Sequence, residues 1–72
     1  MNWLDVEDLA EGLLETHPAR DPLRVRFTEL RALVEALPGF ERDDDHHVNE
    51  KILEAIQGEW YRLKAGLPKS ED

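Results

Sequence analysis

The sequence predicts a small all-α protein, a single domain in which three amphipathic helices pack around one core. The first observation behind this prediction is length, because 72 residues make one domain and leave no room for a second. The second is periodicity, because apolar residues recur at helical spacing in three separate stretches. The third is that helix-capping and helix-ending residues separate these stretches. We assign residues 1–66 to the helical domain and residues 67–72 to a flexible C-terminal tail.

The first helix is expected at residues 6–16. Asp5 precedes it and is of the type favoured at an N-cap, and Leu4 and Leu9 have the spacing of a hydrophobic staple. Leu9 and Leu13 fall on one face with the other apolar residues of this stretch. The acidic residues occupy the rest of the helix surface without an intervening lysine or arginine. We therefore expect one buried face and one anionic face.

The segment between the first and second helices has turn and extended character. The Asp-Pro pair at 21–22 is a cap-and-start signal for a short helical turn. Val25 and Phe27 alternate with arginines, which predicts an extended piece laid on the core. Thr28 then has the residue type of an N-cap, and we expect it to cap a second helix at residues 29–37.

The third helix is expected at residues 50–64. The sequence "PGF" ends the second helix, and Phe40 is expected to turn back into the core. Asn49 is the predicted cap of the third helix, with Val48 and Leu53 as a staple. The predicted core combines one stripe from each helix with the neighbouring aromatic residues: Leu9, Leu13, Phe27, Leu30, Val34, Phe40, Ile52, Ile56 and Trp60.

The charge of the chain limits its partners. Seventeen acidic and nine basic residues give a net charge of −8, which disfavours nucleic acids and anionic membranes and favours basic proteins or cations. Arg20, Arg24, Arg26 and Arg31 are the only concentration of basic residues, and we expect them to pair with acids instead of DNA. Cysteine is absent, so the chain offers no thiolate ligand and cannot accept sulfur covalently.

Catalysis and membrane insertion are not expected. The sequence contains no Ser/His/Asp order, glycine-rich phosphate loop or H-E-x-x-H helix, and a small helical chain offers little concavity in which to exclude water from a reaction. No run of 18 apolar residues and no signal-like N-terminus occur. We therefore expect a soluble, cytoplasmic monomer that is not an enzyme and holds no tightly bound cofactor.

The acids of the first helix form the main candidate site. Asp8, Glu11 and Glu15 follow i, i+3, i+7 spacing, and like charges at such spacing cost a few tenths of a kcal/mol per pair. A cation or a basic surface would relieve this repulsion. The alternative is that the acids complement the helix dipole and keep a small protein soluble. This alternative fits Asp5 and Asp8, near the helix start, better than it fits Glu11 and Glu15.

The stretch "DDDHH" suggests a second candidate site. Asp43, Asp44 and Asp45 offer oxygen ligands for hard cations, and His46 and His47 offer imidazoles for ferrous iron or zinc. Adjacent loop residues converge on an ion only if the backbone folds around it, and the glycine required by an EF-hand loop is missing. The alternative is a solvated loop near a helix N-terminus. With either interpretation we expect metal binding in the micromolar range or weaker.

Three blocks of sequence occur together in a recognisable order behind Trp3. They are "DPLRVRFTEL", "LPGF" followed by acids, and "NEKILEAIQGEW". In these blocks the chain resembles the IscX family, small acidic proteins encoded with the bacterial iron–sulfur cluster assembly machinery. The resemblance extends from Trp3 to Trp60, nearly the whole domain, and does not include His46 or His47.

The resemblance implies a modified winged-helix fold that is mostly helical. It also implies binding to the cysteine desulfurase of the assembly system and weak binding of ferrous iron. Two hypotheses follow, an acidic adaptor that docks on the desulfurase and an iron carrier that donates iron to cluster assembly. The resemblance further places acids at the matching family positions Asp5, Glu29, Glu50 and Glu54.

The candidate residues come from the acid spacing and the resemblance together. The predicted partner-binding residues are Asp5, Asp8, Glu11, Glu15, Glu50 and Glu54. The predicted metal ligands are Asp8, Glu11, Glu15, Asp43, Asp44 and Asp45.

Overall fold

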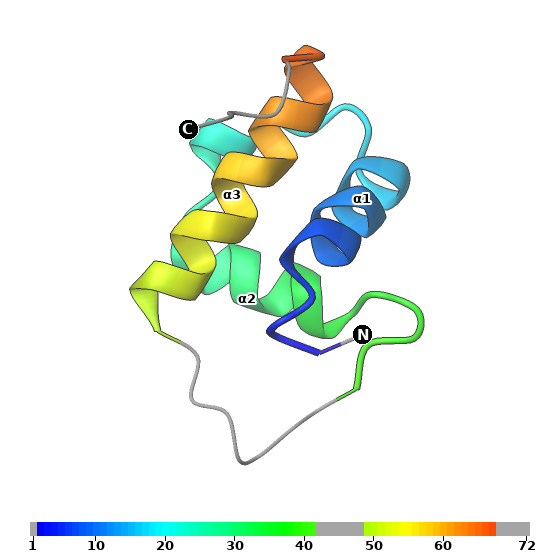
Figure 1. The fold of residues 1–72 in the computed structure, drawn as a ribbon, viewed down its shortest axis with the longest axis vertical. Coiled ribbons are helices and arrows are strands. Elements are labelled where there is room, and N and C mark those ends of the chain that lie inside the picture. Colours follow the sequence, from blue (N-terminus) through cyan, green and yellow to red (C-terminus); the bar gives the residue numbers. More distant parts are fainter. Residues whose placement is uncertain (1, 42–48, 68–72) are drawn as a thin grey trace.

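The computed structural model describes residues 2–41 and 49–67. It contains, in order, α1 (Val6–Thr16), the 3-10 helix η1 (Pro22–Arg24), α2 (Phe27–Glu35) and α3 (Glu50–Ala65). Helices α1 and α3 lie side by side and form the most extensive contact, while α2 crosses beneath them (Figure 1). The described residues contain no β-strand, so the predicted all-α, three-helix fold is confirmed.

Helix α1 has the predicted bounds but not the predicted start signals. Asp5 occupies the N-cap position without capping through its side chain. Its Oδ2 instead accepts a hydrogen bond of 2.9 Å from the backbone N–H of Asn2. Leu4 is 60% exposed, so the predicted hydrophobic staple with Leu9 is wrong. The start of α1 therefore depends on the burial of its apolar face.

The short turn η1 is built as predicted and is attached to α3. Asp21 accepts a hydrogen bond of 3.0 Å from the backbone N–H of Leu23. Gln57 of α3 donates hydrogen bonds from its side-chain amide to two carbonyls, that of Pro22 at 2.8 Å and that of Val25 at 3.3 Å. Val25 is extended and buried, as expected, but Phe27, predicted as part of the same extended piece, is instead the first residue of α2. These bonds satisfy the backbone carbonyls of a segment that is not part of a long helix.

Helix α2 begins and ends two residues earlier than predicted. Arg26 is its N-cap, and the Arg26 carbonyl already accepts a hydrogen bond of 2.8 Å from the N–H of Leu30. Thr28 therefore lies inside the first turn, and its prediction as the cap is wrong. The helix ends at Glu35, since Leu37 belongs to a turn in which its N–H donates to the Val34 carbonyl at 3.1 Å. Proline cannot continue a helix, and Pro38 follows directly.

Helix α3 has its predicted cap and ends one residue later than predicted. Asn49 Oδ1 accepts a hydrogen bond of 3.0 Å from the backbone N–H of Ile52, which confirms Asn49 as the cap. The other half of the predicted staple, Val48, lies outside the described residues. Gly66 ends the helix in the left-handed conformation with φ of 70°, which glycine adopts without steric cost. Residues 68–72 of the predicted tail also lie outside the described part of the chain.

The core contains six of the nine predicted residues as fully buried side chains. Phe27, Phe40 and Ile52 are partly buried and pack at its edge. Trp60 of α3 is completely buried, and its Nε1 has no hydrogen-bond partner among the described residues. Trp3 joins the core from the N-terminal segment. The buried apolar residues are Trp3, Leu9, Ala10, Leu13, Val25, Leu30, Val34, Leu37, Leu53, Ile56 and Trp60.

Candidate functional site

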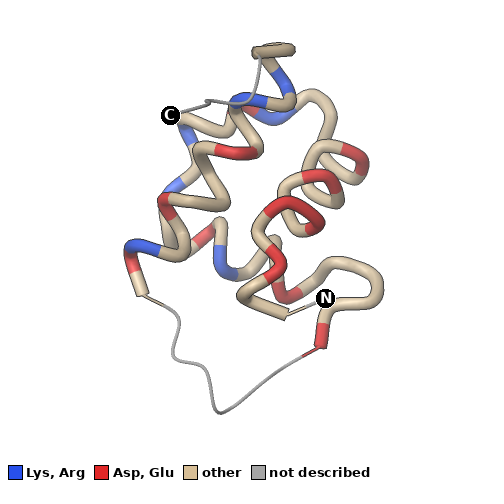
Figure 2. Tube along the Cα trace, in the orientation of Figure 1, with Lys and Arg blue, Asp and Glu red and all other residues tan. Residues whose placement is uncertain are grey.

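The acid row is the set Asp8, Glu11 and Glu15 on the outer surface of α1. All three residues are exposed, and acidic residues follow one another along α1 with no lysine or arginine among them (Figure 2). Glu15 lies in the last turn of the helix, which contains no basic residue. Negative charge is unfavourable there, because the carbonyl end of the helix dipole is itself negative. Dipole complementarity therefore does not explain Glu15.

The acid row has no cationic partner within the described part of the chain. Four acids elsewhere in the described residues are paired with arginines, whereas no side-chain hydrogen bond or ion pair among these residues reaches Asp8, Glu11 or Glu15. The repulsion between neighbouring acids of the row is thus not offset from within the described structure. The ion pairs elsewhere are Arg20–Glu29, Arg24–Asp21, Arg31–Glu35 and Arg62–Glu59.

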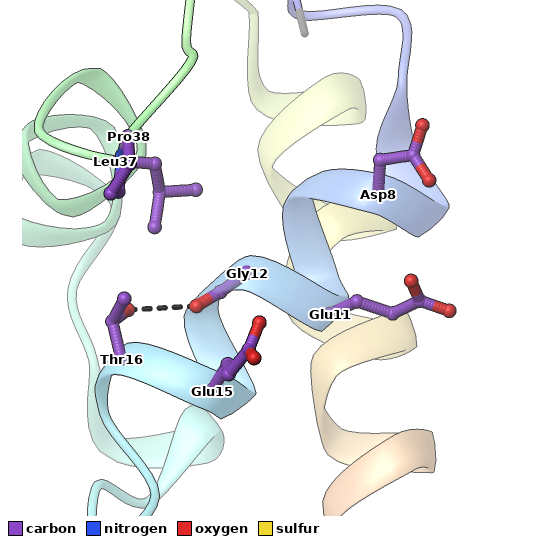
Figure 3. A pocket seen from close by; sticks show the side chains of 7 residues that line it. All are labelled: Asp8, Glu11, Gly12, Glu15, Thr16, Leu37 and Pro38. Carbon is purple, nitrogen blue, oxygen red and sulfur yellow. Dashed lines mark hydrogen bonds between the residues drawn. The ribbon is translucent and has the colours of Figure 1, made fainter.

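A hollow lies beside the acid row, between α1 and the turn that follows α2. We call it the Gly12 hollow; Figure 3 shows its lining residues, which are Gly12, Thr16, Leu37, Pro38 and the three members of the acid row. Leu37 is 6% exposed and forms part of its wall. The surface is thus apolar where α1 meets the turn and anionic along the outer side of α1.

Two local features shape this hollow. Gly12 allows α1 to approach the turn closely, because a Cβ atom on Gly12 would lie 3.3 Å from Cδ1 of Leu37. Thr16 Oγ1 donates a hydrogen bond of 2.7 Å to the Gly12 carbonyl (Figure 3). This bond engages the Thr16 hydroxyl proton within the helix. In Figure 3 the carboxylates of Asp8 and Glu11 point away from Leu37, along the outer side of α1, so a cationic group would meet them at the rim of the hollow.

The other predicted partner-binding acids lie at separate places on the surface. Asp5 lines a shallow depression with Leu4 and Asp8 at the start of α1. Glu50 is exposed in the first turn of α3. Glu54 lines a hollow between α1 and α3, together with Val6 and other residues of both helices. The Gly12 hollow contains neither Glu50 nor Glu54, so the structure groups Asp8, Glu11 and Glu15 but not the six acids as one site.

The hollow between α1 and α3 is electrostatically different from the acid row. Arg62 lies on its rim and is paired with Glu59. The hydrogen bond between these side chains, reinforced by the charge of Glu7, raises the pKa of the Arg62 guanidinium. A permanent positive charge therefore offsets part of the negative charge at this place.

Metal binding has no preassembled site in the described residues. They contain no group of three or more histidine, aspartate and glutamate side chains that could hold an ion. Asp8, Glu11 and Glu15 are therefore spread along a helix and do not converge on one point. The predicted loop ligands Asp43, Asp44 and Asp45 lie outside the described residues, and the weak iron site stays a prediction.

Comparison with known proteins identifies the family. Residues 1–64 match the family model described as "Iron-sulphur cluster assembly". The chain belongs to this family, the IscX family. An uncharacterised protein of Pseudomonas aeruginosa is 45% identical to this IscX-family chain over 60 residues, which is 83% of the present chain and 89% of the relative. No solved structure matches the chain significantly.

Membership of the IscX family gives the chain a role in iron–sulfur cluster assembly. In the parts of the chain that the structure describes, no helix is long and apolar enough to span a bilayer. The acid row was predicted from the sequence, whereas Gly12, Leu37 and Pro38 were not. An isolated glycine inside a helical pattern is unfavourable and can have a packing reason, but Gly58 shows the same pattern without a close neighbour, so the sequence did not distinguish Gly12.

Proposed function

We propose that this IscX-family protein is an adaptor that regulates iron–sulfur cluster assembly by binding the cysteine desulfurase through the acid row. The observation that carries the proposal is that Asp8, Glu11 and Glu15 are exposed and have no cationic partner in the described structure. A basic surface on the desulfurase would supply the missing charge and relieve the repulsion within α1.

Electrostatics of this kind determine how the two proteins meet. Complementary fields accelerate encounter and fix orientation more than they increase affinity. The net charge of −8 extends this effect beyond the contact residues. Binding should therefore weaken steeply as ionic strength rises. At physiological salt the Debye length is about 8–10 Å, and interactions between exposed charges farther apart than this are largely screened.

Weak binding of ferrous iron is the second part of the proposal. Carboxylates suit hard cations, but tight binding needs several ligands that converge on one ion. The described acids do not provide such a group, which favours open and weak binding over carriage of iron as the main activity. Iron would then modulate the adaptor by neutralising part of its anionic surface.

Separate titrations of the purified protein with the desulfurase and with ferrous iron test this proposal. An adaptor binds the desulfurase in a salt-dependent manner, and it loses its iron on dialysis. Retention of iron through dialysis, with no detectable binding to the desulfurase, would instead support the iron carrier. Binding to the desulfurase that does not respond to salt would contradict the role of the acid row.

A further inference from the structure

We propose that the Gly12 hollow receives a lysine or arginine side chain of a partner protein, with the aliphatic stem against the hollow and the cationic end at the acid row. This inference rests on the proposed function and adds to it the chemistry of one contact. The hollow combines two kinds of surface in one place: Gly12, Leu37 and Pro38 on one side and three carboxylates on the other.

The apolar part matches the stem of a long basic side chain. Lysine and arginine commonly lay their methylene groups along apolar surface and keep the charged end in water. The Leu37 side chain packs directly against Gly12, where an added Cβ would lie 3.3 Å from its Cδ1, and the turn after α2 holds Leu37 in place. A stem of three or four methylenes would cover this surface.

The anionic part selects a cation over a neutral side chain. Asp8, Glu11 and Glu15 all line the hollow and lack a cationic partner within the described residues. The Thr16 hydroxyl already donates a hydrogen bond to the Gly12 carbonyl, so the hollow presents acceptors to an incoming group. An apolar side chain of the same length would leave these charges unsatisfied and is a poorer occupant.

Gly58 provides a matched control for changes at Gly12. Both glycines lie inside helices, and alanine increases helix propensity at either position. An added Cβ on Gly58 would contact nothing within 4 Å, whereas the Cβ on Gly12 would lie 3.3 Å from Leu37, which lines the hollow. The same chemical change therefore alters the hollow in one variant only.

The test uses short capped peptides with a lysine on each side of one central residue, and only this central residue is changed. The central residue is lysine, ornithine, diaminobutyrate or norleucine, and binding to the full chain is followed by NMR shifts of α1 amides at mildly acidic pH. The first three carry the same charge on stems that shorten by one methylene at a time, and norleucine keeps an apolar chain without charge. We expect affinity to fall about two- to fourfold for each methylene removed, because that is the effect of losing a buried methylene.

The two glycine variants complete the experiment. Gly12→Ala should remove the preference for lysine over diaminobutyrate, and Gly58→Ala should retain it, with circular dichroism verifying that both are folded. Equal binding of the three charged peptides, tightest binding of the norleucine peptide, or no peptide binding at all would overturn the inference. Any of these results leaves the proposed function standing if the desulfurase still binds in a salt-dependent manner, so the two failures are distinguishable.

Discussion

The indole ring of Trp3 meets the ring of Phe40 edge to face, with centroids 5.2 Å apart and an interplanar angle of 76°. Trp3 precedes α1 and Phe40 follows the turn after α2. The contact therefore joins the segment before α1 to the turn that forms one wall of the Gly12 hollow, because Leu37 and Pro38 belong to the same turn as Phe40. Aromatic packing thus helps to fix the position of one wall relative to α1.

This aromatic pair should be coupled energetically. Trp3→Ala and Phe40→Ala are each expected to destabilise the protein, and the double variant should lose less than the sum of the two. The expected coupling is about 0.5–1.5 kcal/mol, the value typical of aromatic pairs beyond their buried area. Urea denaturation of the four proteins measures it, and strictly additive losses would show that the rings do not interact in solution.

Trp60 is expected to be indispensable for folding. Its side chain projects from α3 and is completely buried in the hydrophobic core. Replacing a buried tryptophan by alanine lowers the free energy of unfolding by about 3–5 kcal/mol. That is most of the stability of a small domain near the lower limit of about 5 kcal/mol. Thermal denaturation followed by circular dichroism checks the prediction, with Tyr61→Ala as the control because Tyr61 is 38% exposed. A similar loss in both variants would contradict the burial of Trp60.

The two helical glycines should respond differently to alanine. Gly58→Ala is expected to raise the free energy of unfolding by about 0.5–1 kcal/mol, because the helix gains propensity and the new methyl group meets no neighbour. Gly12→Ala should gain less, since its Cβ would press on Leu37 at 3.3 Å. Denaturant titrations compare the two, and a larger gain at Gly12 would refute the close approach of α1 to Leu37.

The two N-cap positions should also differ. Asn49→Ala is expected to cost about 0.5–2 kcal/mol, because it removes the hydrogen bond to the N–H of Ile52. Asp5→Ala should cost less, because Asp5 makes no such bond to α1. If unfolding free energies gave the opposite order, the side-chain cap at Asn49 and its absence at Asp5 would both be contradicted.

Local sequence signals predicted the ends of helices and turns correctly where the predicted residues themselves make the hydrogen bonds that form them. The Asn49 cap and the Asp-Pro turn at 21–22 form through hydrogen bonds of the predicted residues. The Thr28 cap failed because tertiary packing placed Phe27 in the first turn of α2, so that Arg26 became the cap. The capping preference of threonine is worth only about 1 kcal/mol, and burial of an aromatic ring outweighs it.

The candidate site was predictable only in part, because part of it depends on contacts between residues that are distant in the sequence. The spacing of Asp8, Glu11 and Glu15 on one helix is a property of the sequence, and the structure retains it. The apposition of Gly12 and Leu37 joins residues 25 positions apart, and it depends on how α2 ends and turns. No periodicity within either segment contains that information, so the wall of the hollow became visible only in the folded chain.

The most direct test of the account compares two charge reversals with equal changes in net charge. One variant replaces Asp8, Glu11 and Glu15 by lysine, and the other replaces Asp43, Asp44 and Asp45 by lysine. The side chains of the acid row are exposed, so the first variant should keep its helical circular dichroism spectrum.

The Kd of each variant for the cysteine desulfurase, measured by isothermal titration calorimetry at one ionic strength, is the deciding quantity. We predict that the α1 variant loses measurable binding and that the 43–45 variant binds more weakly than the unmodified protein but remains detectable. Unchanged affinity of a folded α1 variant, together with loss of binding in the 43–45 variant, would contradict the assignment of the acid row as the docking surface.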